Sequence, residues 1–185
     1  MIHVVDNFLD ITLFDKAREE ISTRIPAKMH YEKTSKKNVP IRLGGKISNT
    51  KVYNFDVLLG LSAKPIVNVI KKYISENLKF KNAQENWLWY QCTLLETEKV
   101  KPHYDGRILN KMPTQCFTSF IYMHEKWEDD WGGELCFKDK EILPKPNRFV
   151  IYSRDHLHWV NSILHNIPDY QRMSIGVDWS TDNDF

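Results

Sequence analysis

The clearest pattern in the chain is the alternation near its C-terminal end, where residues 171–179 read Gln-Arg-Met-Ser-Ile-Gly-Val-Asp-Trp. Side chains two apart on a strand point to the same face of a sheet. The segment therefore predicts a strand with one apolar face, suited to a core, and a second face suited to a site. The apolar face carries Met173, Ile175, Val177 and Trp179, and the other carries Arg172, Ser174, Gly176 and Asp178.

Short apolar runs of the same kind begin at Trp87 and are separated by Gly and Pro turn signals. They predict strands at roughly 87–95, 99–103, 115–123, 134–138, 148–152, 157–163 and 171–179. Within 115–123, one face is predicted to carry Thr118, Phe120 and Tyr122. Many short strands with no helix between them indicate a mainly β sandwich or jelly roll.

The N-terminal part has a different periodicity. Residues 2–9 are rich in β-branched side chains and predict a first strand, whereas residues 11–24 and 57–77 repeat apolar positions at helical spacing. No repeat or linker divides the 185 residues, so a single domain is expected over 1–185. Its helical part covers about 1–80 and its jelly-roll core about 85–180.

Composition narrows the class of protein only a little. Hydrophobic residues make up 42%, charged residues 27%, and the net charge is +2, which is ordinary for a globular protein. The three cysteines show no pair spacing and sit in apolar runs, which is typical of a reducing compartment. With no signal-like start and no membrane-length apolar run, we expect a cytoplasmic protein.

Residues 28–51 break the pattern and are rich in lysine, with Gly44 and Gly45 inside. One interpretation is a basic flap that covers a site and recruits an acidic partner. The alternative, which we favour, is a solvated loop.

Candidate metal ligands lie in the segment Lys101-Pro102-His103-Tyr104-Asp105. In an extended segment His103 and Asp105 point to one side, and a second imidazole from the distant strand, His156 or His158, would complete a face of two histidines and one carboxylate. Such a face leaves open positions on a divalent metal and suits non-haem Fe(II). A structural zinc site would use four closed ligands.

The polar face of the last predicted strand offers a site for an anion. The guanidinium of Arg172 presents a planar fork to a carboxylate, and the hydroxyl of Ser174 adds one more donor. Gly176 leaves room beside them.

Together, His103-x-Asp105, His158 and Arg172-x-Ser174 resemble the Fe(II)/2-oxoglutarate-dependent oxygenases. The segments 4–9, 131–135 and 144–152 are similar to the prolyl 4-hydroxylase-type branch. The resemblance spans about residues 3–180. It implies a double-stranded β-helix, the cupin-like jelly roll, with N-terminal helices bracing one sheet.

The resemblance also implies roles. His103, Asp105 and His158 would hold Fe(II), with His158 preferred to His156 because Val160 follows it by two residues as in that branch. Arg172 and Tyr122 would bind the distal carboxylate of 2-oxoglutarate, with Ser174 beside them. The activity implied is hydroxylation of a C–H bond with O2, releasing succinate and CO2, and a prolyl residue of a protein or peptide is the favoured substrate.

Some positions depart from the branch pattern. A tyrosine expected nine residues before the first metal histidine is replaced by Leu94, for which Tyr90 is a candidate substitute. The spacing of 14 residues from His158 to Arg172 (172 − 158) is longer than usual. His124, which lacks a partner at metal spacing, is interpreted as a surface or hydrogen-bonded core histidine.

Two alternatives from other classes stay open. One is a cupin-like metal protein without 2-oxoglutarate chemistry, and the other is a jelly-roll binding module that is not an enzyme. Among substrates, a free amino acid or a nucleic acid is the alternative to a prolyl residue.

Overall fold

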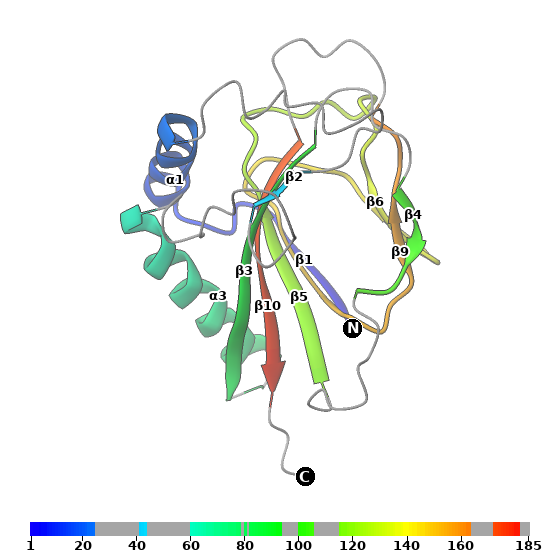
Figure 1. Cartoon of the computed structure of the whole chain (residues 1–185), viewed down its shortest axis with the longest axis horizontal. Coiled ribbons are helices and arrows are strands. Elements are labelled where there is room, and N and C mark those ends of the chain that lie inside the picture. The colour runs from blue at the N-terminus through cyan, green and yellow to red at the C-terminus, as the bar shows by residue number, and fades with distance from the viewer. Residues whose placement is uncertain are drawn as a thin grey trace.

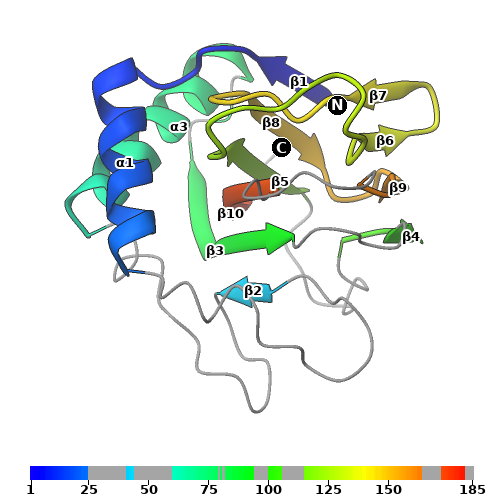
Figure 2. The same ribbon diagram turned by 90° about the horizontal axis from the view of Figure 1, so that it is seen from above.

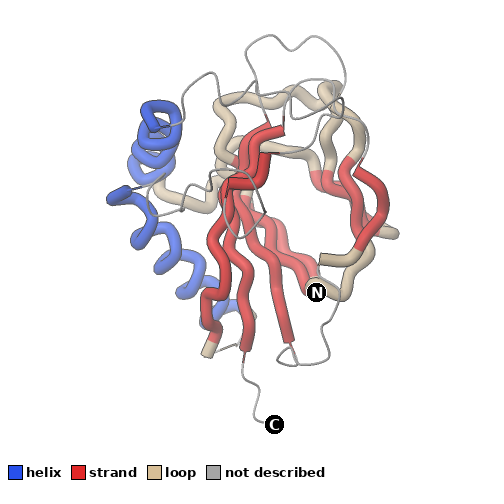
Figure 3. Tube along the Cα trace, in the orientation of Figure 1, coloured by secondary structure: helices blue, strands red, loops and turns tan. Residues whose placement is uncertain are grey.

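The computed structural model describes residues 1–24, 41–43, 60–78, 80, 82–93, 100–105, 115–163 and 172–181. Two helices and two antiparallel sheets make up this part of the chain, as Figure 1 and Figure 2 show. Colouring by secondary structure in Figure 3 places both helices on the same side of the strands. Neither these helices nor any other helix in the described ranges combines the length and apolar character needed to cross a membrane.

The larger sheet has six strands in the order β1-β8-β5-β10-β3-β2. Their bounds are β1 Ile2–Val5, β8 Phe149–Ser153, β5 Gln115–Tyr122, β10 Arg172–Thr181, β3 Ala83–Thr93 and β2 Ile41–Leu43. The smaller sheet has the order β4-β9-β6-β7, with β4 Val100–His103, β9 His158–Val160, β6 Leu135–Phe137 and β7 Lys140–Ile142. The mainly β jelly roll predicted from the strand pattern is confirmed.

The helices cover the outer face of the larger sheet (Figure 2). Helix α1 spans Ile11–Arg24, as its periodicity predicted, and a short 3-10 turn η2, Gly60–Ser62, leads into α3, Ala63–Asn77. Asp10 caps the N-terminus of α1, because its Oδ1 accepts a hydrogen bond from the backbone N–H of Thr12 at 2.9 Å. Buried residues of both helices form one core with the apolar face of the sheet: Phe14, Ala17, Ile21, Ile66, Ile70, Ile74, Phe117, Ile121, Phe149, Ile175, Val177 and Trp179.

The inner face of the larger sheet meets the smaller sheet through a second core of Phe120, Tyr122, Leu135, Phe137, Ile142, Val150 and Tyr152. The alternation predicted for residues 115–123 is therefore confirmed, since Phe120 and Tyr122 lie inside the roll and Ile121 faces the helices. The same holds for β10, whose Ser174 lies opposite Tyr122 in the strand register. The polar face of β10 thus points into the roll.

Several element ends differ from the sequence prediction. β1 ends at Val5 instead of continuing to residue 9, because Asn7 adopts a positive φ of 51°. The following residues are held by Asn147. Its side-chain oxygen accepts a hydrogen bond from the N–H of Leu9 at 2.9 Å, and its side-chain nitrogen donates one to the carbonyl of Leu9 at 2.8 Å. The sequence pattern also missed the three-residue strands β2 and β7, which are too short to show a period. The assignment of the whole chain to one domain stays a prediction.

Candidate active site

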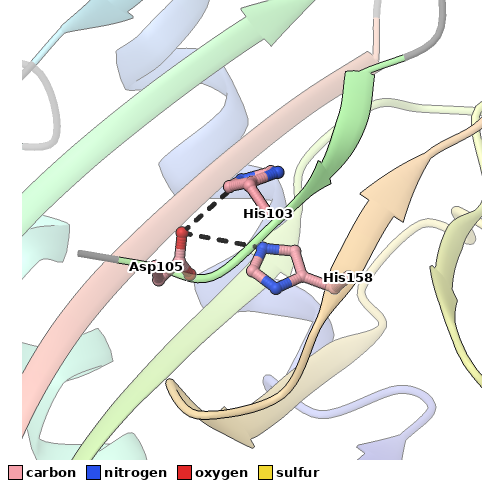
Figure 4. Close-up of side chains that lie close together, drawn as sticks. All are labelled: His103, Asp105 and His158. Atoms are coloured by element: carbon pink, nitrogen blue, oxygen red, sulfur yellow. Dashed lines mark ion pairs between the residues drawn. The ribbon is translucent and has the colours of Figure 1, made fainter. Parts of the chain in front are cut away.

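Three potential metal ligands meet where the smaller sheet faces the inside of the roll. β4 and β9 pair antiparallel with His103 opposite His158, and Asp105 follows the end of β4 (Figure 4). The Oδ1 atom of Asp105 lies 3.8 Å from Nε2 of His103 and 3.6 Å from Nε2 of His158. One ligand atom from each of the three residues lies within 4.8 Å of the others. Two ligands of one ion with bonds of about 2.1 Å lie at most about 4.2 Å apart, so small side-chain movements bring all three onto a single ion.

Main-chain carbonyls fix both imidazoles in the orientation that a metal requires. Nδ1 of His103 lies 2.8 Å from the carbonyl oxygen of Lys101, and Nδ1 of His158 lies 2.9 Å from that of His156. A carbonyl oxygen can only accept, so each Nδ1 carries the proton and donates. Nε2 is then the nitrogen of each ring that faces Asp105 and is placed to bind a metal.

His156 and His158, the two sequence candidates for the second histidine ligand, lie in different positions. His158 is buried and belongs to the three-residue cluster. His156 is half-buried, and its Nε2 lies 2.7 Å from the amino group of Met1. Among the described residues His156 therefore supports His158 through its carbonyl and does not join the cluster.

Two hydroxyl groups to which the sequence assigned no role contact the carboxylate of Asp105. Tyr152 donates to Oδ2 of Asp105 at 2.5 Å, and Thr118 donates at 3.2 Å. Burial, and then the charge of Asp105, raises the pKa of Tyr152 well above its ordinary value, so its hydroxyl stays protonated. Tyr152 is the last residue of the segment 144–152, and Thr118 lies on the same face of its strand as Tyr122. The alternation of side chains along these strands was therefore the one sequence signal that could have identified the two residues.

Arg172 and Tyr122 form the second part of the site. Nη2 of Arg172 donates to the hydroxyl of Tyr122 at 3.0 Å, and the guanidinium carbon lies 4.9 Å from the centre of the Tyr122 ring. Burial raises the pKa of Tyr122, and the charge of Arg172 partly opposes this shift. The side chain of Ser174 is buried on the same face, opposite Tyr122.

The buried cation of Arg172 has no carboxylate partner among the described residues. Its guanidinium has five N–H donors, and the hydrogen bonds to Gly133 and Tyr122 use two of them. A buried charge is costly unless it is paired. This arrangement is therefore suited to a carboxylate or another anion.

The Gly132-Gly133 turn gives Arg172 its position. Nε of Arg172 donates to the carbonyl of Gly133 at 2.9 Å. Gly133 has a φ of +74°, and a Cβ atom there would lie 3.3 Å from Cδ of Arg172 and 3.2 Å from side-chain atoms of Ile163 and Trp127. The turn thus requires glycine both for its conformation and for the space beside Arg172.

His124 is a core histidine, one of the two interpretations that the sequence left open, and is not a surface residue. The ring is 1% exposed, and neither nitrogen has a hydrogen-bond partner among the described residues. Burial, followed by the charge of Arg172, lowers the pKa of His124 to about 3, although nearby carbonyls of Pro144 and Met173 oppose the shift. His124 is therefore a neutral ring against Tyr122 and Trp127.

Some sequence predictions fall on residues that the structure does not describe. Leu94, the side chain of Tyr90 and the segment 164–169 lie outside the described residues. The same is true of the basic segment 28–51, except for β2.

Solved structures with the same fold include several prolyl hydroxylases. A prolyl 4-hydroxylase of Pseudomonas putida is 12% identical, with a TM-score of 0.66 over 98% of this chain and 92% of that chain. A viral collagen prolyl hydroxylase from Paramecium bursaria Chlorella virus-1, in complex with 2-oxoglutarate, is 12% identical, with a TM-score of 0.66 over 97% and 96%. A prolyl hydroxylase of Trichoplax adhaerens, in complex with a hypoxia-inducible-factor peptide, is 14% identical, with a TM-score of 0.63 over 98% and 83%. At these identities the likeness establishes the fold.

Part of the sequence matches a known family. No curated protein matches the chain, but the family model for the 2OG-Fe(II) oxygenase superfamily matches residues 88–177, the stretch that contains β4, β5, β9 and most of β10. This stretch includes the histidine pair and the buried arginine described above. Residues 88–177 thus match the 2OG-Fe(II) oxygenase superfamily, the dioxygenases that depend on Fe(II) and 2-oxoglutarate.

Proposed function

We propose that the chain is a hydroxylase in which His103, Asp105 and His158 bind Fe(II) and Arg172 and Tyr122 bind the distal carboxylate of 2-oxoglutarate. The observation that carries the proposal is the pairing of two sites on one inner surface. One is a three-ligand cluster, and the other is a buried arginine with no carboxylate partner in the described part of the chain.

The ligand cluster fits Fe(II) by its chemistry. Two neutral imidazoles and one carboxylate form the set that non-haem Fe(II) oxygenases use, and they leave open positions for other ligands. The fixed Nδ1–H donors keep both Nε2 atoms available. The half-buried side chain of His103 leaves the cluster accessible from outside, whereas His158 forms its buried side.

The second site fits the far end of the cosubstrate. Tyr122 lies on the same inner face of β5 as Thr118, which contacts Asp105, so the two sites open onto one inner surface of the roll. Arg172, Tyr122 and Ser174 share that inner face. Arg172 supplies the charge, the Tyr122 hydroxyl adds a hydrogen-bonding group, and Ser174 is a neighbouring donor. These residues orient the cosubstrate and exclude water around its carboxylate.

Bound Fe(II) and 2-oxoglutarate supply the oxidation of a C–H bond by O2, with release of succinate and CO2. A prolyl residue of a protein or peptide is the favoured substrate, because solved structures with this fold include prolyl hydroxylases and one of them holds a peptide. A free amino acid and a nucleic acid are the other substrate classes. We also propose a cytoplasmic location.

An anaerobic titration tests the cofactor assignment. Fe(II) and 2-oxoglutarate added together to the wild-type protein should give a visible charge-transfer absorption, and His103→Ala should abolish it. A cupin-like protein without 2-oxoglutarate chemistry would bind the metal and show no such band. A binding module would bind metal no better than the His103→Ala variant. Either result would reject the proposal.

Succinate release then tests the substrate class. The loaded enzyme is supplied with prolyl peptides, free amino acids and oligonucleotides, and substrate-dependent succinate is measured. Stimulation by prolyl peptides alone supports the favoured substrate. Stimulation by one of the other two panels replaces it with that class and leaves the cofactor assignment intact.

A further inference from the structure

The two oxygen atoms of Asp105 have different surroundings. Oδ1 faces the imidazoles of His103 and His158 at 3.8 and 3.6 Å. Oδ2 accepts hydrogen bonds from Tyr152 at 2.5 Å and from Thr118 at 3.2 Å. One oxygen is thus presented to the ligand cluster, and the other is held by hydroxyl groups.

We propose that Tyr152, assisted by Thr118, is a positioning residue that keeps Asp105 a one-oxygen metal ligand. The inference rests on the proposed metal site and adds a determinant of its geometry. A carboxylate whose second oxygen is free can turn and chelate the ion through both oxygens. That would occupy one of the open positions that the cosubstrate and O2 need.

The position of Tyr152 makes its hydroxyl a rigid donor. The side chain is 3% exposed and stands on β8 between β1 and β5. Its ring packs edge-on against Phe137, with the centroids 5.2 Å apart, and lies 4.9 Å from the ring of His158. A side chain packed on several sides loses little additional freedom when it makes its hydrogen bond. The donor is fixed before any metal binds.

Thr118 is the weaker of the two donors because its hydroxyl lies farther from Oδ2 of Asp105 than that of Tyr152, at 3.2 Å against 2.5 Å, and because a second carboxylate competes for it. Its oxygen lies 3.2 Å from Oδ2 of Asp105 and 3.2 Å from Oδ1 of Asp178. A hydroxyl has a single hydrogen, so Thr118 can donate fully to one carboxylate at a time. Tyr152, whose shortest contact is with Asp105, is therefore the principal donor to this ligand.

The main chain of Asp105 is held by the same group of residues. Nε of Arg154 donates to the carbonyl of Asp105 at 3.0 Å, and its Nη1 lies 3.7 Å from Oδ2 of Asp178. Together with Thr118, these contacts form a closed ring through Asp105, Thr118, Asp178 and Arg154. The ring fixes the backbone from which the carboxylate projects, so the hydroxyl of Tyr152 needs only to set the rotation of the carboxylate.

The test uses Co(II) added to the full chain without cosubstrate, because Co(II) reports coordination by its visible absorption. Tyr152→Phe should bind Co(II) 10- to 100-fold more weakly than wild type, the usual effect of losing a hydrogen bond to a metal ligand, and its absorption spectrum should change. The matched control is Tyr104→Phe, which removes the same hydroxyl from an exposed tyrosine between the two ligands. The control should bind within about twofold of wild type.

Thr118→Val and Thr118→Ser keep the proposal testable if Tyr152→Phe does not fold. The valine variant should bind Co(II) more weakly, and the serine variant, which retains the hydroxyl, should restore wild-type affinity. Wild-type affinity and an unchanged spectrum in Tyr152→Phe, or in Thr118→Val where only that variant folds, would overturn the inference.

These outcomes are separate from failure of the proposed function. If the metal site itself is wrong, wild type and His103→Ala will bind Co(II) equally. If only the positioning role is wrong, His103→Ala will lose the metal while Tyr152→Phe retains it. A merely structural role for Tyr152 would lower the thermal stability of the metal-free variant without changing the Co(II) spectrum.

Discussion

The buried ring of His124 gives the protein a specific dependence of stability on pH. Because the pKa of His124 is lowered to about 3 in the folded state from an ordinary value of about 6.5, only the unfolded chain takes up this proton between those values. The contribution of the neutral, buried His124 ring to the free energy of unfolding is complete above pH 6.5 and is lost as the pH falls toward 3. We expect a variant without this imidazole to lack this decrease in the free energy of unfolding.

The size of the effect follows from proton linkage. Each pH unit below 6.5 costs about 1.4 kcal/mol until the folded-state pKa is approached. Between pH 7.5 and 5.5, wild type should therefore lose about 1.4 kcal/mol more of its unfolding free energy than His124→Phe. With a urea m value of about 2 kcal/mol/M, the wild-type midpoint should fall by about 0.7 M more than that of the variant.

The assay is urea unfolding of wild type and His124→Phe at several pH values, with a chelator present to exclude metal linkage. His124→Gln is a second variant that cannot titrate in this range but keeps a polar group, and it separates titration from packing. Both variants should show the shallower dependence on pH, whatever their stability at neutral pH. If wild type and both variants lose stability in parallel, the reasoning about His124 is wrong.

Substitutions at three further positions have defined outcomes. Arg172→Gln removes the buried cation and should weaken 2-oxoglutarate binding by about 100-fold, as loss of a charged hydrogen bond implies, with Co(II) affinity unchanged; equal cosubstrate affinity would contradict its role. Gly133→Ala places a Cβ atom 3.2–3.3 Å from its neighbours at a φ of +74°. The free energy of unfolding, measured by thermal unfolding, should therefore fall by about 2 kcal/mol. Wild-type stability in this variant would refute the steric argument. Asn147→Ala loses two hydrogen bonds to Leu9 and should lower the free energy of unfolding, measured in urea, by about 2–4 kcal/mol. Asn147→Gly loses the same hydrogen bonds but tolerates the φ of 55°, so it should lower this free energy less. Equal losses in the two variants would assign the whole effect to the side chain.

Features set by neighbouring residues could be predicted from the sequence. The helix over Ile11–Arg24 and the two faces of β5 and β10 follow from local periodicity, which depends only on residue spacing. The predicted partners Arg172 and Tyr122 are adjacent in the structure because both lie on the inner faces of paired strands. Their binding of 2-oxoglutarate stays a proposal.

Features set by contacts between distant residues could not be predicted. Tyr152 is 47 residues from Asp105, and parity alone did not indicate that their side chains meet. His156 and His158 share one parity, and only the pairing of β9 with β4 places His158 opposite His103. That the ring of His124 finds no hydrogen-bond partner within the described ranges is likewise a property of the packed interior.

The sequence by itself determined the chemical groups available and the faces on which they stand, because side-chain direction repeats with the local backbone. Only the tertiary structure decided which of those faces meet, because the register between strands depends on contacts far apart in the chain. The orientation of Asp105, the fixed Nδ1–H donors and the burial of the Arg172 charge beside Tyr122 all arise at that second level.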